Sequence, residues 1–186
     1  MKNLILLAAV AAAVLPAAAQ AAPANIVVVE SDRVYAECTA CKSAQSQLQS
    51  QAQALQSRQQ ALSTQLKTEA SSLQAAADAL KGAPPSAALK TRVTAFQARQ
   101  GTAQEELGRM QQTLQSTQAN VLRQINAKLS PAINQVMVAK GANLAVDANA
   151  TLAHGATLDV TNEVLAALNA ALPSVSVTPG AATQGR

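Results

Sequence analysis

The stretch LKGAPPSAALK, residues 80–90, decides the fold of this chain. Gly82, Pro84 and Pro85 interrupt a pattern that is otherwise helical from residue 42 to residue 130. Proline lacks a backbone N–H and clashes with the preceding helical turn, whereas glycine suits the left-handed residue that follows a helix end. Ser86 can then cap a second helix. The stretch therefore predicts a turn, residues 82–86, between two long helices.

Both predicted helices carry a narrow apolar stripe. In the first, with polar exceptions at positions 59 and 69, leucines fall seven residues apart in two successive sets, the second displaced by four: Leu48, Leu55 and Leu62, then Leu66, Leu73 and Leu80. In the second, apolar residues alternate at spacings of four and three from Leu89 to Val121 and then move over by one, beginning with Leu122. Two apolar residues in seven form the seam of a coiled coil rather than the wide face of a globular helix.

The stripes predict an antiparallel coiled-coil hairpin over residues 42–137. Its first helix would extend about 60 Å at 1.5 Å per residue. Two unrelated helices of a compact bundle are the alternative.

Short apolar segments on both sides of the hairpin predict a small body, residues 22–41 and 138–172. NIVVVE (25–30) has the β-branched composition of a strand, NLAVDA (143–148) alternates like one, and ATLAHGA (150–156) suggests another. A helix over residues 160–172 completes the body, and residues 173–186 are expected to be a disordered tail. The predicted fold class is α+β: a small β-rich oligomerisation body that carries a long helical arm.

The composition indicates that this body is shared between chains. The sequence has no Trp, one Tyr and one Phe, so a single chain has few large side chains with which to build a core. A few short strands and one short helix bury too little surface to be stable alone. We therefore expect an oligomer whose shared body uses Ile26, Val27, Val28, Val29, Leu144, Val146, Val164, Leu165 and Leu168.

The first 21 residues have the features of a secretory signal peptide. Lys2 precedes an apolar run over residues 4–15, which is shorter than the roughly 20 residues needed to cross a bilayer. The small residues that follow place cleavage after Ala21, with Ala22 as the alternative. We expect export to a periplasm, an oxidising compartment in which disulfides persist.

The charges are unevenly distributed along the chain. Residues 38–140 hold eleven Lys or Arg against four acidic residues, whereas the rest of the chain after residue 21 holds two against six. A basic surface can bind acidic protein segments, anionic lipid or nucleic acid. Nucleic acid is disfavoured, because the basic residues are dispersed and one Tyr and one Phe are too few aromatic side chains for base stacking.

The motif CTAC, residues 38–41, has three interpretations. The histidine of a c-type haem motif is missing after the second cysteine, and the surrounding pattern is not the βαβ unit of a thioredoxin-like site. A structural disulfide between Cys38 and Cys41, free or interchain thiols, and a redox function remain as alternatives. The sole histidine, His154, has no companion ligands nearby in sequence. We therefore expect no enzyme, no metal site and no cofactor.

Two segments carry a resemblance to a known family. LAVDANATLAHGATLDVTNEVLAALN (144–169) resembles the C-terminal signature of the Skp/OmpH family of periplasmic chaperones, in which a strand and a D-x-N-like turn lead into D(V/I)T and a terminal helix. IVVVESDRVYAE (26–37) is similar to the family's opening strand and short helix. The arm rich in Gln, Ala and Ser, the cysteine pair and the Pro-rich tail depart from the family pattern.

The resemblance implies a homotrimer whose arms enclose unfolded outer-membrane proteins, the clients, without ATP. Anionic lipid or lipopolysaccharide is a further candidate partner, with no residue assigned to it. The side chains that we expect to capture clients are Lys67, Lys81, Lys90, Arg92, Phe96 and Arg99. A structural or adaptor coiled-coil protein of the cell envelope, without chaperone activity, is the alternative function.

Overall fold

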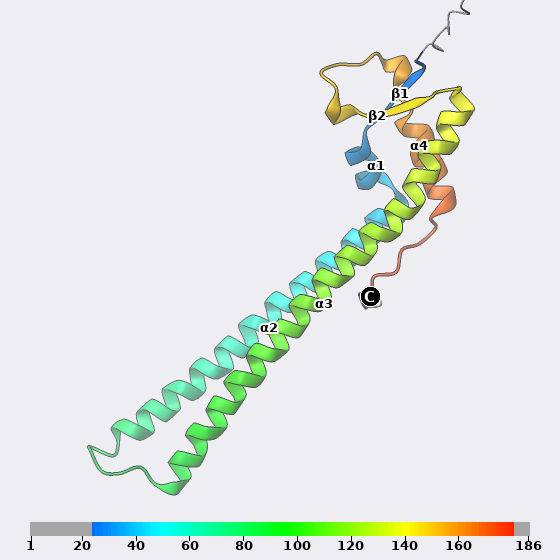
Figure 1. Ribbon diagram of the computed structural model, residues 1–186. Helices are drawn as coiled ribbons and strands as arrows, with labels where there is room; N and C mark the ends of the chain where they lie inside the picture. Colours follow the sequence, from blue (N-terminus) through cyan, green and yellow to red (C-terminus); the bar gives the residue numbers. More distant parts are fainter. Residues whose placement is uncertain (1–23, 181–186) are drawn as a thin grey trace, which may run out of the picture.

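The computed structural model describes residues 24–180, so the predicted signal peptide and the last six residues lie outside the described part of the chain. A small mixed body stands at one end of a long two-helix projection (Figure 1). In chain order the elements are β1 (Ile26–Val29), α1 (Ser31–Glu37), α2 (Thr39–Asp78), α3 (Ala87–Lys140), β2 (Leu144–Asp147), the 3₁₀ turns η1 (Ala148–Ala150) and η2 (Ala156–Leu158), and α4 (Thr161–Ala171).

The sheet of the body consists of two parallel strands. β1 pairs with β2 in a register that sets Ile26 opposite Leu144 and Val29 opposite Asp147. Parallel neighbours require a long crossover connection, and here the whole helical hairpin supplies it. The sheet can therefore form only after two segments more than a hundred residues apart in sequence have met.

The strand predicted over residues 150–156 is wrong, because Ala150 ends the first 3₁₀ turn, Ala156 begins the second, and residues 151–155 connect them without regular structure. The Asp147 carboxylate accepts a hydrogen bond from the backbone N–H of Asn149 at 2.8 Å, which turns the chain as soon as β2 ends. The returning chain contributes one isolated parallel bridge, between Val28 and Asp159.

The predicted hairpin is present, and its turns form as the residue types indicate. Ser86 caps α3 by accepting a hydrogen bond from the N–H of Leu89 at 3.2 Å, and Gly82 has a φ of 92° in the tip turn. Gly141 ends α3 in the left-handed conformation, with a φ of 63°. α3 continues through Pro131 without interruption, so this residue does not end the helix.

The main core lies where the base of the arm meets the body. It combines side chains of β1 and α1, the first turns of α2, residues 121–136 of α3, and α4. The core thus extends into segments that the sequence assigns to the arm, because α3 packs against α4 along its last turns. This packing also corrects the predicted seam. Val121 and Ile125 are buried, whereas Leu122 is 53% exposed.

Residues 173–180, which we call the C-terminal strap, differ from the predicted disordered tail. After α4 the chain continues beside α3 toward the arm (Figure 1). Val175 and Val177 are half-buried against the main core. The strap is held by hydrogen bonds from both arm helices, such as Gln51 Nε2 to the Val177 carbonyl at 3.1 Å. Within residues 24–180, no helix combines the length and apolar character needed to cross a membrane.

Candidate functional site: the helical arm and its base

Two bidentate ion pairs set the register of the arm. Arg58 Nε and Nη2 lie 2.6 and 3.0 Å from the two carboxylate oxygens of Glu106. Nearer the tip, Arg99 forms a second bidentate pair with Glu69, in which Nε lies 2.9 Å from Oε2. Each pair joins α2 to α3, so the two helices are aligned in antiparallel register along their outer half.

The pair of Arg58 and Glu106 shifts the pKa of both groups. The hydrogen bonds from Arg58 hold the pKa of the Glu106 carboxyl below its ordinary value, and the same bonds raise the pKa of Arg58. The two side chains remain 42% and 31% exposed. Because water screens such a pair, it aligns the helices more than it stabilises them.

The apolar seam between the arm helices is thin. Of the predicted seam leucines of α2, Leu62 and Leu73 are buried, whereas Leu55 and Leu66 are only half-buried. A small residue, Ala103, is buried on the opposite helix. The seam therefore holds the helices together while part of its apolar surface stays within reach of solvent.

An apolar hollow of about 520 Å³ opens at the tip of the arm. It lies between the end of α2 and the start of α3, around Leu73, Leu80, Leu89 and Val93, with Lys90 at its edge. Val93 is 38% exposed, although the sequence places it in the seam. The hollow exists because Pro85 and the tip turn separate the helices just where their stripes would otherwise close on each other.

A second apolar hollow, of about 510 Å³, lies at the base of the arm. Tyr35 of α1, Leu48 of α2 and Leu122 of α3 line it, together with the buried Ile125. Sequence reasoning missed this site, since Leu122 was expected inside the seam. The one-residue shift of the apolar stripe after Val121 was the available signal.

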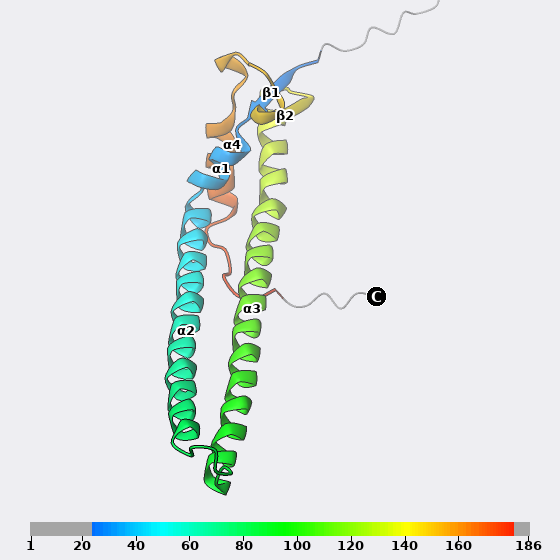
Figure 2. The same ribbon diagram turned by 90° about the vertical axis from the view of Figure 1, so that its left-hand side faces the viewer.

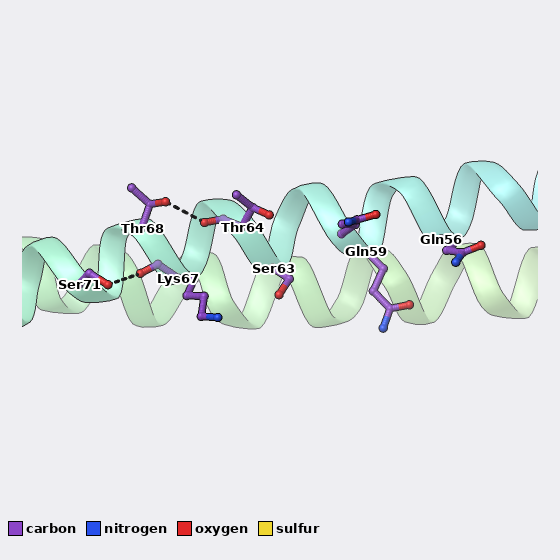
Figure 3. A pocket seen from close by; sticks show the side chains of 8 residues that line it. Gln56, Gln59, Ser63, Thr64, Lys67, Thr68 and Ser71 are labelled. Atoms are coloured by element: carbon purple, nitrogen blue, oxygen red, sulfur yellow. Dashed lines mark hydrogen bonds between the residues drawn. The ribbon is translucent and has the colours of Figure 1, made fainter.

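The outward face of α2 offers a different, polar surface. Its concave stretch is lined by Gln56, Gln59, Gln60, Ser63, Thr64, Lys67, Thr68 and Ser71, all from α2 (Figure 3). The Ser71 and Thr68 hydroxyls donate to the carbonyls of Lys67 and Thr64, both at 3.0 Å, so they are satisfied within the helix. This arrangement suits solvation and weak, non-directional contact rather than catalysis.

The expected client-binding arginines have partners within the chain. Arg92 donates from Nη2 to the Ser72 hydroxyl at 3.0 Å, and Arg99 is bound to Glu69. Both arginines therefore tie α2 to α3. Their charge still contributes to the field of the arm, but their donors are partly used.

The expected client-binding lysines are exposed. Lys67 lies on the polar face of α2, Lys81 in the tip turn and Lys90 at the edge of the tip hollow. Phe96 is half-buried on α3, one turn beyond Val93. The structure thus groups Lys81 and Lys90 with the apolar tip, whereas Lys67 stands further along the arm.

The residues expected to join bodies in an oligomer fall into two groups. Five of them are buried in the core of one chain: Val27, Val28, Val29, Val164 and Leu168. The other four are accessible: Leu144 is 47% exposed, and Ile26, Val146 and Leu165 are half-buried. The first group stabilises the single chain, so of these nine residues only the second group is accessible for a contact between bodies.

Cys38 and Cys41 form an intrachain disulfide, with their Cα atoms 5.1 Å apart. Both residues are buried at the junction of α1 and α2. The interpretations that required free or interchain thiols are therefore wrong. The disulfide cross-links the bend between α1 and α2, at the point where the arm leaves the body.

His154 is not isolated in space, in contrast to its place in the sequence. One ligand atom each from Glu30, His154 and Asp159 lie within 4.8 Å of one another. Asp159 already accepts a hydrogen bond from the N–H of Thr161 at 2.8 Å, and its hydrogen bonds to Thr161 hold its pKa below the ordinary value. Asp159 therefore helps to start α4, and we assign no metal to the cluster.

The fold matches that of a solved structure from Caulobacter crescentus, described as a candidate outer membrane chaperone that is OmpH-like. The TM-score is 0.71 and the sequence identity 22%, over 89% of this chain and 95% of that chain. The class of protein is thus a small α+β body with a long helical hairpin. No curated protein matches the sequence.

The sequence itself then shows the family. The OmpH family, described as "Outer membrane protein (OmpH-like)", matches residues 25–168. The chain belongs to this family, and the resemblance seen in its sequence is confirmed. At the level of the family, this supports a chaperone.

Proposed function

We propose that this protein is an ATP-independent holdase of the periplasm, which keeps unfolded outer-membrane proteins soluble by enclosing them between helical arms. The observation that carries the proposal is the arm. It is long, its seam is thin, and apolar hollows of about 520 and 510 Å³ open at its tip and base. Membership of the OmpH family supports the same conclusion.

The mechanism follows from the surface chemistry of the arm. Each Å² of apolar surface removed from water contributes roughly 25 cal/mol of favourable free energy to binding, whatever the orientation of the client. Small hollows and half-buried leucines therefore give many weak contacts that fit unrelated clients. Because each contact is weak, a client leaves when folding into the outer membrane becomes more favourable, and no ATP is needed.

Charge would serve the capture step. Among residues 24–180, the side-chain amines of Lys67, Lys81 and Lys90 have no hydrogen-bonded or ion-paired partner, and they carry most of the free positive charge near the tip. Exposed charges of this kind act mainly on association rate, and salt weakens them. Acidic client segments are the primary targets, and the same positive charge would attract anionic lipid or lipopolysaccharide.

The enclosing state would be a homotrimer joined through the bodies. Large apolar side chains of the body remain exposed: Val138 at 81%, Leu144 at 47% and Leu152 at 109%. Apart from the bridge between Val28 and Asp159, the edges of the two-stranded sheet have no partner strand within residues 24–180, which favours pairing with another chain. Sedimentation equilibrium on the mature protein tests this part, and a folded monomer at micromolar concentration would refute it.

A direct assay tests the holding activity. An unfolded outer-membrane β-barrel protein is diluted from urea with and without the mature protein, and light scattering is followed. We expect suppressed scattering, and slower capture with reduced salt dependence when Lys67, Lys81 and Lys90 are all replaced by Gln. A folded protein that leaves scattering unchanged would favour the structural or adaptor function instead.

A further inference from the structure

The C-terminal strap lies across both arm helices, whose side chains hydrogen-bond to it, and we call the surface of α2 and α3 beneath it the groove. Figure 2 shows residues 173–180 descending between α2 and α3 just below the body. The strap lies beyond residues 25–168, the part of the chain that matches the family. Membership of the family therefore does not explain the contacts of the strap.

Side-chain amides of the arm bind the strap only through its backbone. Gln124 pairs with Ser176 in both directions, donating to its carbonyl and accepting from its N–H, each at 3.0 Å. Asn120 donates to the carbonyl of Thr178 at 3.0 Å, and Gln51 donates to that of Val177 at 3.1 Å. Backbone groups are the same in every residue, so these four hydrogen bonds do not depend on the sequence that is bound.

The side chains of the strap alternate between the groove and solvent. Val175 and Val177 pack against the main core, whereas Ser174, Ser176 and Thr178 are exposed. Recognition through backbone hydrogen bonds combined with alternate apolar positions is how proteins bind extended peptides. Strands of outer-membrane barrels carry this same alternation of apolar and polar residues.

We infer that the groove under the strap is a binding site for an extended segment of an unfolded outer-membrane protein, and that the strap occupies it in cis. This inference rests on the proposed function for the identity of the client. A client segment must displace the strap to bind. The strap follows α4 directly, so its effective concentration at the groove is of the order of millimolar, and only segments that bind well or in several places compete.

Peptide binding to the full-length chain tests the inference. The probe is a fluorescent peptide with the strap sequence PSVSVTPG, followed by anisotropy. In the test variant, Val175→Ser and Val177→Ser together release the strap. The matched control is Ser174→Ala, which changes an exposed strap residue only. A chain ending at Leu172 provides a second released form, and circular dichroism checks that each protein is folded.

We expect the released forms to bind the probe at least tenfold more tightly than the unaltered protein and the Ser174→Ala control. Adding Gln124→Ala to a released form should weaken binding at least fivefold. An unrelated peptide of alternating Thr and Ile should displace the probe, whereas PSSVVTPG, with adjacent valines, should not. Equal binding to all forms, absence of binding to both released forms, or failure of the Thr and Ile peptide to compete would each overturn the inference. Because this assay contains no aggregating client, its outcome is independent of the holding assay.

Discussion

Shortening the arm tests whether it is the element that encloses clients, as proposed, separately from the body. We would delete residues 53–114 and join the ends by a short turn containing glycine. Residue 58 faces residue 106 and residue 69 faces residue 99, so residues 53 and 114 lie close to opposite each other. The deletion removes residues 53–78, or 26 of the 40 residues of α2, which is about 39 Å of a helix about 60 Å long.

The structure predicts that the remaining body stays folded. Every residue of the main core lies outside the deletion, and only Leu62, Leu73 and Ala103 are lost among the buried side chains. We therefore expect the melting temperature to move by less than about 5 °C, the shift that about 1 kcal/mol causes in a domain of this size. The strap contacts at Gln51 and Asn120 are also retained.

The assay is suppression of client aggregation, measured together with oligomeric state. We expect the shortened protein to keep the oligomeric state of the full-length protein and to lose at least nine-tenths of its holding activity. A control that removes one heptad from each helix near the tip shortens the arm by only about 10 Å and should retain most of it. A shortened, folded protein that holds clients as well as the full-length chain would refute enclosure by the arm.

Three further predictions concern stability. Replacing the fully buried Leu168 by Ala should lower the free energy of unfolding by about 2–5 kcal/mol in urea melts, whereas Leu152→Ala, at an exposed site, should leave it nearly unchanged. The carboxyl of Glu106 has a lowered pKa, so its contribution to the stability of the arm is present above about pH 4.3 and is lost as the pH falls through the lowered value. Glu106→Gln should therefore reduce the loss of arm helicity in acid, measured by circular dichroism. An unaltered pH profile of helicity would contradict this. Replacing Cys38 and Cys41 by Ser should lower the free energy of unfolding by about 2 kcal/mol, because the disulfide closes only a short loop, and should leave the holding activity intact. Loss of holding activity by the folded variant would instead favour a redox role.

Local patterns were sufficient to predict most elements of this fold. The residues of the tip, above all Gly82 and Pro85, stop one helix and Ser86 starts the next, because backbone conformation and capping act within a few residues. The spacing of the leucines likewise predicted the seam, and one of the three interpretations of CTAC was the disulfide that the structure contains. The residues of the body carried the family resemblance.

Features that depend on contacts between distant segments could not be predicted from local sequence patterns. Leu122 continues a plausible apolar stripe, but α3 changes its packing partner from α2 to α4 there, and the side chain turns to solvent. Arg99 looked like a free charge until the antiparallel register placed Glu69 opposite it. His154 gained its acidic neighbours only through the path of the loop before α4.

The sequence by itself thus determined the two long helices, their turn and the family, whereas the structure decided among the interpretations of the cysteine pair. The tertiary structure alone decided which apolar residues stay accessible in the two hollows, and that residues 173–180 lie in a groove rather than in solvent. The physical reason is the range of the interactions. Capping, turn chemistry and helix periodicity act over a few residues. The hydrogen bonds of Gln51 and Gln124 to the strap join positions 126 and 52 residues apart, and no local pattern encodes them.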